Sequence, residues 1–313
     1  MTSGTATTRL APAAGPAPLP PGPGTADTAG SLDIAAAFAR AAADGRIALI
    51  PYVVAGYPDA ATGESIAIAA IDAGADLLEL GLPYSDPLAD GTTLQRASAT
   101  AIRAGATLGR SLELLARIHA ARPAVPLVPM AYVNQVIGGA APAEAMRRFV
   151  EAGASGLILA DLTPDEGAPV EAAAVDAGLA IVYLVTPTTP PSRRRAIAAR
   201  SGGFLYCVSL VGVTGARSSL PPEVGRFVGE VTAESPIPVA VGFGVSRPAH
   251  VRRLARVAAG VIVASALVDA LGTDGRDVAA MADLVARLRA ATKTDDRAAA
   301  RAGRPASQPD GRR

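Results

Sequence analysis

Tryptophan is absent from the 313-residue chain, and cysteine and lysine each occur once, as Cys207 and Lys293. A single cysteine excludes a disulfide within the chain and any metal cluster built on cysteine. Because the one lysine lies in the polar C-terminal region, a Schiff-base aldolase, which needs an active-site lysine, is also excluded. The two histidines, His119 and His250, are far apart in helical patterns, and we interpret them as surface or packing residues.

Excess charge and long apolar runs are lacking as well. The chain has 29 Lys and Arg against 28 Asp and Glu, a net charge of +1, so nothing favours nucleic acid or an anionic membrane as a partner. The longest apolar region, residues 123–142, is interrupted by prolines, Asn134 and Gln135, which argues against a membrane span. With no secretory signal pattern at the start and little cysteine, we expect a cytoplasmic protein.

Both ends of the chain differ in composition from its middle. Residues 1–30 are rich in Ala, Pro, Gly and Thr, and Arg9 and Asp27 are their only charged residues. We therefore expect a disordered N-terminal extension. From about Thr292 the sequence turns polar and rich in Ala and Arg, which predicts a disordered tail over residues 293–313. The folded domain is expected over residues 31–292.

Within that domain, short apolar runs alternate with helical segments. The expected strands are Ile47–Val54, Leu77–Leu80, Pro126–Tyr132, Gly156–Ala160, Ala180–Val185, Phe204–Leu210, Pro238–Val241 and Val261–Ala264. The expected helices are 31–45 (capped by Ser31), 60–73, 94–104, 108–121, 143–152, 167–177, 191–200, 222–232, 247–258 and 277–291. Eight such units in about 260 residues favour a single (β/α)₈ TIM barrel, with a doubly wound open sheet as the alternative.

In such a barrel the active site lies at the carboxyl ends of the strands, and the polar residues gather there. Gly212, Gly215, Gly242 and Gly244 follow the sixth and seventh strands, and a helix beginning near Ser246 or Ser265 would aim its positive end at the same place. Backbone N–H groups at glycine turns and helix starts bind anions, so a phosphate site is one interpretation. Ordinary tight turns are the other.

One acid, Glu79, lies inside the apolar second strand, where an unpaired charge costs several kcal/mol. A salt bridge or a hydrogen-bonded core carboxylate would explain it structurally. At the barrel mouth, however, Glu79 is suited to proton transfer, and Asp90, eleven residues later on a proline-stiffened loop, can reach the same cavity. Asp86 is expected to tie that loop together through bonds to the backbone.

The rim segments also form a set of motifs in a fixed order. They read P-Y-V-V-A-G-Y-P-D (51–59), L-E-L-G-L-P-Y-S-D-P-L-A-D-G (78–91), M-A-Y-V-N (130–134), L-A-D-L-T-P-D-E (159–166), G-V-T-G-A-R (212–217) and V-G-F-G-V-S (241–246). Spread over about residues 31–270, this set closely resembles the tryptophan synthase alpha subunit family.

The resemblance implies a fold and a reaction. The family is a (β/α)₈ barrel lyase that cleaves indole-3-glycerol phosphate to indole and glyceraldehyde 3-phosphate, a retro-aldol step in L-tryptophan biosynthesis. It implies that Glu79 is the general acid/base and that Asp90 hydrogen-bonds the indole N–H. Further substrate-binding positions implied by the family are Tyr52 and Phe243 beside the indole, Tyr132, Tyr206, Thr214 on a closing loop, and Gly215, Gly244 and Ser265 at the phosphate.

The family also implies a partner, the tryptophan synthase beta subunit, in an alpha2beta2 heterotetramer. Pyridoxal phosphate would belong to that partner, and the chain itself is expected to need no cofactor and no metal. Alternatives are a stand-alone lyase releasing free indole, a weakly catalytic barrel that activates a beta subunit, or another phosphate-binding barrel enzyme such as an isomerase. Three positions depart from the family pattern: Thr92, Ala264 and Leu210.

Overall fold

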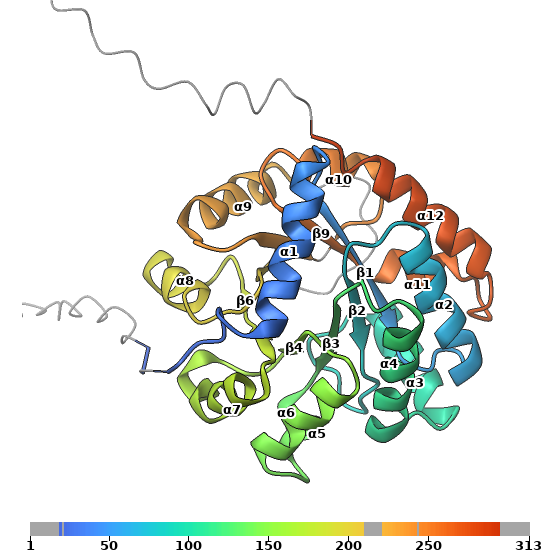
Figure 1. Ribbon diagram of the computed structural model, residues 1–313. Helices are drawn as coiled ribbons and strands as arrows, with labels where there is room; N and C mark the ends of the chain where they lie inside the picture. The colour runs from blue at the N-terminus through green and yellow to red at the C-terminus, as the bar shows by residue number, and fades with distance from the viewer. Residues whose placement is uncertain (1–18, 21, 210–220, 243, 295–313) are drawn as a thin grey trace, which may run out of the picture.

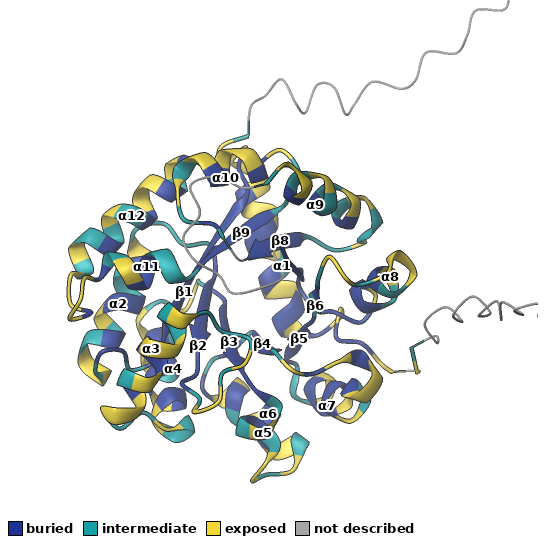
Figure 2. Ribbon diagram, turned by 180° about the vertical axis from the view of Figure 1, so that it is seen from behind, coloured by how far each residue is buried: buried dark blue, intermediate teal, exposed yellow. Residues whose placement is uncertain are grey.

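The computed structural model describes residues 19–20, 22–209, 221–242 and 244–294. In this part of the chain the strands are β1 (Ala48–Val54), β2 (Leu78–Gly81), β3 (Leu127–Ala131), β4 (Gly156–Leu159), β5 (Ala180–Val182), β6 (Leu184–Val185), β7 (Leu205–Val208), β8 (Val239–Gly242) and β9 (Gly260–Val263). They form the centre of the molecule, and their residues are almost all buried (Figure 2).

The sheet is parallel and runs in the order β5-β4-β3-β2-β1-β9-β8-β7-β6. Its two end strands, β5 and β6, are separated in the chain by Tyr183 alone. They are two halves of the strand expected over Ala180–Val185: the first half pairs with β4 and the second with β7. The sheet therefore closes on itself, which confirms the (β/α)₈ barrel and excludes the open doubly wound alternative.

The helices surround this barrel (Figure 1). They are α1 (Ala29–Ala43), α2 (Ala60–Asp72), α3 (Thr92–Arg103), α4 (Leu108–Ala121), α5 (Val133–Ile137), α6 (Pro142–Glu151), α7 (Pro164–Ala177), α8 (Pro191–Ala198), α9 (Pro222–Glu234), α10 (Pro248–Leu254), α11 (Ser265–Ala270) and α12 (Val278–Ala290). Two short helices, α5 and α11, were not among the expected helical segments, although a helix start at Ser265 was.

Helix α1 does not lie in the outer ring but crosses one end of the barrel (Figure 1). Its Ile34 is fully buried, and its Phe38 contacts the ring of Phe204, next to β7, with centroids 5.7 Å apart. The hydroxyl of Ser31 accepts a 2.6 Å hydrogen bond from the N–H of Gly203. Phe204 and Gly203 precede β7, so α1 covers the amino ends of the strands and the site can open only at the carboxyl ends.

Described residues before the expected boundary at residue 31 already contact the barrel. Thr28, not Ser31, caps α1 by accepting a 3.2 Å bond from the N–H of Ser31. Thr25 is buried, and its hydroxyl bonds both the N–H and the carbonyl of Ile181, at 2.9 and 3.2 Å. These bonds between Thr25 and the backbone of Ile181 in β5 join this polar stretch to the barrel.

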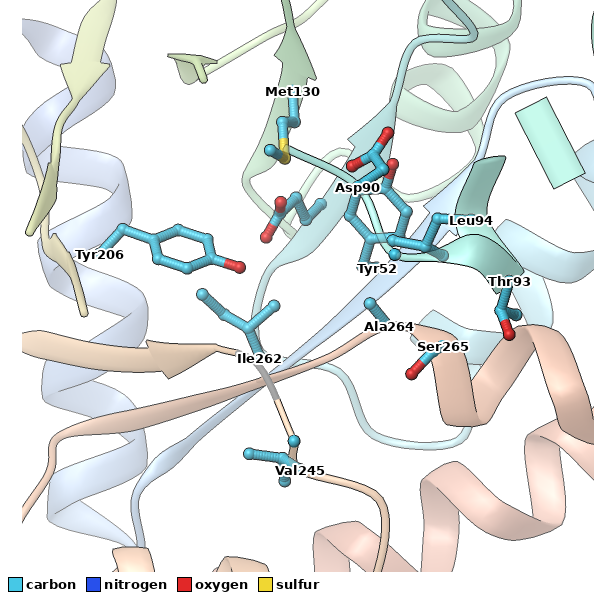
Figure 3. A pocket seen from close by; sticks show the side chains of 13 residues that line it. Tyr52, Asp90, Thr93, Leu94, Met130, Tyr206, Val245, Ile262, Ala264 and Ser265 are labelled. Atoms are coloured by element: carbon cyan, nitrogen blue, oxygen red, sulfur yellow. The ribbon is translucent and has the colours of Figure 1, made fainter. Parts of the chain in front are cut away.

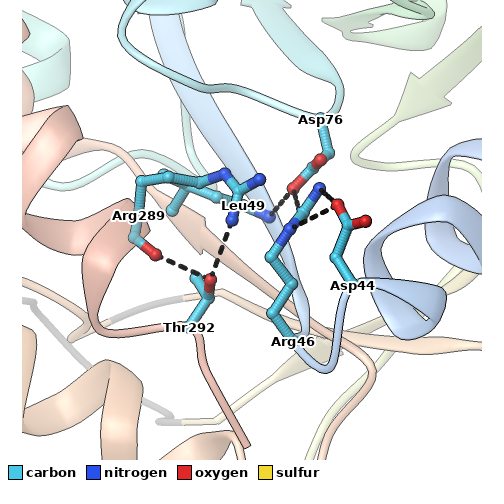
Figure 4. A network of polar contacts seen from close by, with 6 residues as sticks. All are labelled: Asp44, Arg46, Leu49, Asp76, Arg289 and Thr292. Atoms are coloured by element: carbon cyan, nitrogen blue, oxygen red, sulfur yellow. Dashed lines mark hydrogen bonds and ion pairs between the residues drawn. The ribbon is translucent and has the colours of Figure 1, made fainter.

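Polar contacts hold the start of β1 (Figure 4), and the chain that follows α12 contacts the same region. Arg46 forms an ion pair with Asp76 at 2.6 Å, and the same carboxylate accepts a 2.9 Å bond from the N–H of Leu49. Lys293 forms an isolated bridge with Arg46, and Thr294 bonds the carbonyl of Gly45. Residues 293 and 294 thus contact the segment that leads into β1.

A second polar cluster lies outside the barrel and joins α7 to the segment after α8. Glu171 is fully buried and forms an ion pair with Arg200 at 2.7 Å. Its carboxylate also accepts a 2.6 Å bond from the hydroxyl of Tyr183 and a 3.2 Å bond from the N–H of Gly24. With these partners in place, the buried charge of Glu171 is compensated.

Replacing Glu171 by glutamine is expected to lower the free energy of unfolding by about 3–5 kcal/mol, because the change leaves Arg200 as a buried charge without its counterion. Urea denaturation at neutral pH measures this loss. The matched control is Glu151→Gln, which breaks an exposed pair with Arg147 and should change stability by less than about 0.5 kcal/mol. Equal losses in the two variants would show that the Glu171 cluster contributes nothing specific.

Candidate active site

A pocket opens at the carboxyl ends of the strands, as the barrel geometry predicts (Figure 3). It encloses about 580 Å³, part of it open to solvent. Its lining residues come from β1, β2, β3, β7 and β9 and from the segments that follow β2, β8 and β9: Tyr52, Glu79, Asp90, Gly91, Thr93, Leu94, Met130, Tyr206, Gly244, Val245, Ile262, Ala264 and Ser265.

Two tyrosines reach into the pocket from opposite sides, and each lies over a glycine that makes room for it (Figure 3). Tyr52 pairs in register with Glu79, so both side chains project to the same face of the sheet. A Cβ placed on Gly81 would lie 1.8 Å from the hydroxyl of Tyr52, and one on Gly242 would lie 2.3 Å from that of Tyr206. The absence of a side chain at these strand ends therefore leaves the space that both tyrosine hydroxyls occupy.

Glu79 is fully buried near the end of β2. Neither of its carboxyl oxygens has a hydrogen-bond partner among the described residues, and no ion pair to it is found there. Burial raises the pKa of Glu79 to about 8, and the nearby charge of Asp90 adds to the rise. The salt-bridge and hydrogen-bond interpretations of this strand acid thus find no partner in the described part of the chain.

Asp90 ends the loop that follows β2, directly before Gly91, the N-cap residue of α3. Its carboxyl group lines the same pocket, and burial raises its pKa to about 6. At neutral pH, Glu79 therefore keeps its proton while Asp90 is mostly ionised. A pair of carboxyl groups with different protonation states is the arrangement that acid/base chemistry needs.

The two tyrosines remain neutral beside these acids. Burial, followed by the charges of Asp90 and Glu79, raises the pKa of Tyr52 well above its usual value. The pKa of Tyr206 is raised in the same way by burial and by the same two carboxylates. Both hydroxyls are therefore available as hydrogen-bond donors, and neither is suited to act as a base at neutral pH.

The remaining expected site residues fall into three groups. Gly244 and Ser265 line the pocket together with Tyr52 and Tyr206. Tyr132 is buried but does not line it, because its hydroxyl is directed at the backbone of Ala89. The others lie outside the described residues: Thr214, Gly215 and Phe243, as do Gly212 and the divergent position Leu210.

The structure describes part of the expected phosphate segment. Gly244 has a φ of +77°, a conformation that favours glycine, and its carbonyl lies 3.1 Å from Nδ1 of His250. Gly242 lies within β8 beneath Tyr206 and does not line the pocket. The helix after β8 begins at Pro248, two residues beyond Ser246, and α11 begins at Ser265.

Sequence patterns missed the apolar part of the pocket. Met130 on β3 and Ile262 on β9 line it, as do Leu94 from the first turn of α3 and Val245 after β8 (Figure 3). Met130 lies two residues before Tyr132, and Ile262 lies two before Ala264. Since strand side chains alternate between faces, this spacing could have identified both as inward-facing.

Two kinds of feature are absent from the described part of the chain. No group of three or more His, Cys, Asp and Glu residues there could hold a metal ion. None of the helices it contains has the length and apolar character that crossing a bilayer requires.

A closed parallel barrel with a pocket at the carboxyl ends of its strands is the architecture of (β/α)₈-barrel enzymes. Comparisons with known proteins identify the family within this class. A family model described as tryptophan synthase alpha chain matches residues 38–298. The tryptophan synthase alpha chain of Deinococcus radiodurans is 44% identical over 265 residues, which cover 84% of this chain and 97% of that relative. The one from Roseiflexus castenholzii is 45% identical over 258 residues, covering 82% and 98%.

Solved structures agree with the sequence relatives. A structure of Mycobacterium tuberculosis tryptophan synthase is 39% identical with a TM-score of 0.76, covering 84% of this chain and 98% of that chain. A tryptophan synthase subunit alpha from Legionella pneumophila gives a TM-score of 0.76 at 31% identity, covering 83% and 98%. The chain belongs to the tryptophan synthase alpha chain family. The predicted lyase activity, cleavage of indole-3-glycerol phosphate, is thereby confirmed.

Proposed function

We propose that the rim pocket binds indole-3-glycerol phosphate and cleaves it with Glu79 as the general acid/base and Asp90 as its electrostatic partner. The observation that carries this proposal is the fully buried carboxyl group of Glu79, which has no partner among the described residues and a pKa raised to about 8 beside Asp90. Burying a carboxyl group without a hydrogen-bond partner costs free energy. A bound substrate that supplies the missing partner explains why the acid is there.

The protonation states support an order of events. Protonated Glu79 delivers its proton to the ring carbon that carries the glycerol chain, and the resulting positive charge spreads to the indole nitrogen. Ionised Asp90 accepts a hydrogen bond from that N–H and stabilises the charge. The carboxylate of Glu79 then takes the proton of the adjacent glycerol hydroxyl, the carbon–carbon bond breaks, and its electrons return to the ring. Indole and glyceraldehyde 3-phosphate leave, and Glu79 is protonated again.

The pocket walls suit the two ends of such a substrate. Tyr52, Met130 and Leu94 provide apolar surface for an indole ring, and Phe243 is proposed beside it by family resemblance. Gly244 and Ser265 line the pocket on the side of β8 and β9, where a phosphate group is proposed to bind. Thr214 and Gly215 are proposed from the same resemblance to complete the closing loop and the phosphate contacts.

A tryptophan synthase beta subunit is the proposed partner, in an alpha2beta2 complex. The support is the family and the similarity to structures of Mycobacterium tuberculosis tryptophan synthase. The chain has no lysine other than Lys293, so pyridoxal phosphate is proposed only on the partner, and this chain is proposed to work without cofactor or metal. The cytoplasm is the proposed compartment.

Indole release by the purified chain tests this function, with and without a beta subunit. We expect indole and triose phosphate in equal amounts from indole-3-glycerol phosphate, and a higher rate when beta subunit is added. A rate that beta subunit leaves unchanged would favour the stand-alone lyase. No indole in either condition, from protein that is folded, would contradict the proposal.

A further inference from the structure

The loop that carries Asp90 has little internal support. This segment, residues 82–91, is here named the acid loop. Within it, the N–H of Leu88 bonds the carbonyl of Asp86 at 2.9 Å, and the N–H of Asp90 bonds the carbonyl of Pro87 at 3.1 Å. Leu88, at its tip, is 93% exposed. A catalytic carboxylate on such a loop needs anchors from elsewhere in the fold, because small displacements of a reacting group cost rate.

Those anchors come from the segment that follows β3. The hydroxyl of Tyr132 accepts a 2.9 Å hydrogen bond from the N–H of Ala89, the residue directly before Asp90. The ring of Tyr132 also stacks on that of Tyr84, with centroids 5.0 Å apart. At the start of the acid loop, Nε2 of Gln135 on α5 donates a 2.9 Å bond to the carbonyl of Pro83. Tyr132 and Gln135 therefore hold both ends of the acid loop.

The anchoring segment is itself fixed. The N–H of Val133, next to Tyr132, donates a 2.8 Å bond to the carboxylate of Asp161, beyond the end of β4. On the other side of the acid loop, Nε2 of Gln95 on α3 donates a 2.9 Å bond to the carbonyl of Asp90. The N–H of Ala89 and the carbonyl of Asp90 are thus bonded by Tyr132, after β3, and by Gln95 on α3. The carboxyl group of Asp90 faces the pocket (Figure 3).

We propose that Tyr132, supported by Gln135, is a positioning residue that holds Asp90 over the pocket, and that it does not contact the substrate. This inference rests on the proposed function, which gives Asp90 its role. Tyr132 is 6% exposed and does not line the pocket, and its hydroxyl is already used as an acceptor for the Ala89 N–H. Its effect on the reaction passes through the acid loop.

Tyr132→Phe tests the proposal because it keeps the ring that stacks on Tyr84 and removes only the acceptor of Ala89. We expect kcat for indole release to fall about 10-fold, up to the 100-fold that a displacement of about 1 Å can cost, with KM changed less than about twofold. Gln135→Leu should lower kcat in the same direction. The matched control is Tyr183→Phe, which removes a hydroxyl bonded to Glu171 away from the pocket and should leave kcat unchanged.

A double-mutant cycle with Asp90→Asn gives the deciding measurement. If Tyr132 acts only through Asp90, then Tyr132→Phe should have no further effect on kcat in the Asp90→Asn protein, so the two effects are not additive. Thermal unfolding of each variant separates loss of fold from loss of rate. Should Asp90→Asn alone keep full activity, the proposed role of Asp90 is wrong, and that failure is distinct from a failure of the anchor.

Three results would overturn the positioning role of Tyr132. The first is a wild-type kcat in the folded Tyr132→Phe protein. The second is a raised KM at unchanged kcat, which would make Tyr132 a substrate-binding residue. The third is a loss of the same size in the wild-type and Asp90→Asn backgrounds, which would show that Tyr132 acts independently of the acid loop.

Discussion

Glu79→Gln is expected to lower kcat for indole release by about 10³-fold or more, because one carboxyl group carries both proton transfers of the proposed mechanism. Glutamine has nearly the same shape, so the substrate should still bind and KM should change little. Steady-state indole release at pH 7.5 measures the effect, with Glu151→Gln as a surface control. Near-full activity in the folded variant would mean that another group moves the protons.

The same substitution is expected to stabilise the protein at alkaline pH. The folded-state pKa of Glu79 is about 8, raised from 4.5, so between these values the native state binds a proton that the unfolded state has released. Wild-type stability therefore falls as pH rises from about 4.5 to about 8 and is level beyond. The rise of this pKa from 4.5 to about 8 corresponds to a loss of about 5 kcal/mol in the free energy of unfolding at high pH, as an upper limit.

In Glu79→Gln this cost is absent. The variant should thus gain stability over the wild type as pH rises through the window, with the full difference at pH 9 and almost none at pH 4.5. Urea denaturation at several pH values measures the gain in the free energy of unfolding. Asp90, whose pKa is raised to about 6, is present in both proteins, so the comparison reports on Glu79. A variant no more stable at pH 9 than the wild type would show that Glu79 is well solvated or paired. Lost activity with gained stability is the combination that marks a residue kept for function.

The barrel could be predicted from the sequence because the patterns that indicate its strands and helices are local. Apolar runs such as Leu77–Leu80, followed by glycine and helix, indicate buried parallel strands wherever they occur. Glu79 was recognisable for the same reason: a charged residue in an apolar strand is anomalous without any knowledge of its neighbours. The division of the fifth strand at Tyr183 was not predictable in this way, since it depends on which two strands lie beside it in the closed sheet.

Roles that depend on contacts across the barrel could not be predicted from the sequence either. Gly242 looked like part of a phosphate-binding turn, but its lack of a side chain accommodates the hydroxyl of Tyr206. Thr28 caps α1 although Ser31 has the same capping chemistry, because the hydroxyl of Ser31 accepts a bond from Gly203 instead. In each case a polar or small residue had several local explanations, and only the three-dimensional neighbour decides between them.

Gly244→Asp is the second substitution with a large expected effect. Gly244 lines the pocket where the phosphate is proposed to bind, and an aspartate there would place a negative charge beside a doubly charged group. Two unit charges about 4 Å apart near a protein surface repel by about 4 kcal/mol, so KM for indole-3-glycerol phosphate should rise on the order of 10²–10³-fold. Indole carries no phosphate, so its KM in the reverse reaction should rise far less.

Backbone strain must be separated from charge in this test, since Gly244 has a φ of +77° and its carbonyl lies against His250. Gly244→Ala is the matched control: it carries the same left-handed backbone conformation, at a cost of about 1–2 kcal/mol, without the charge. The ratio of KM values between the aspartate and alanine variants then isolates the electrostatic effect, which should weaken as salt is raised. If the two variants raise KM for the phosphate ester equally, or if indole is affected as strongly as the ester, the phosphate does not bind at Gly244.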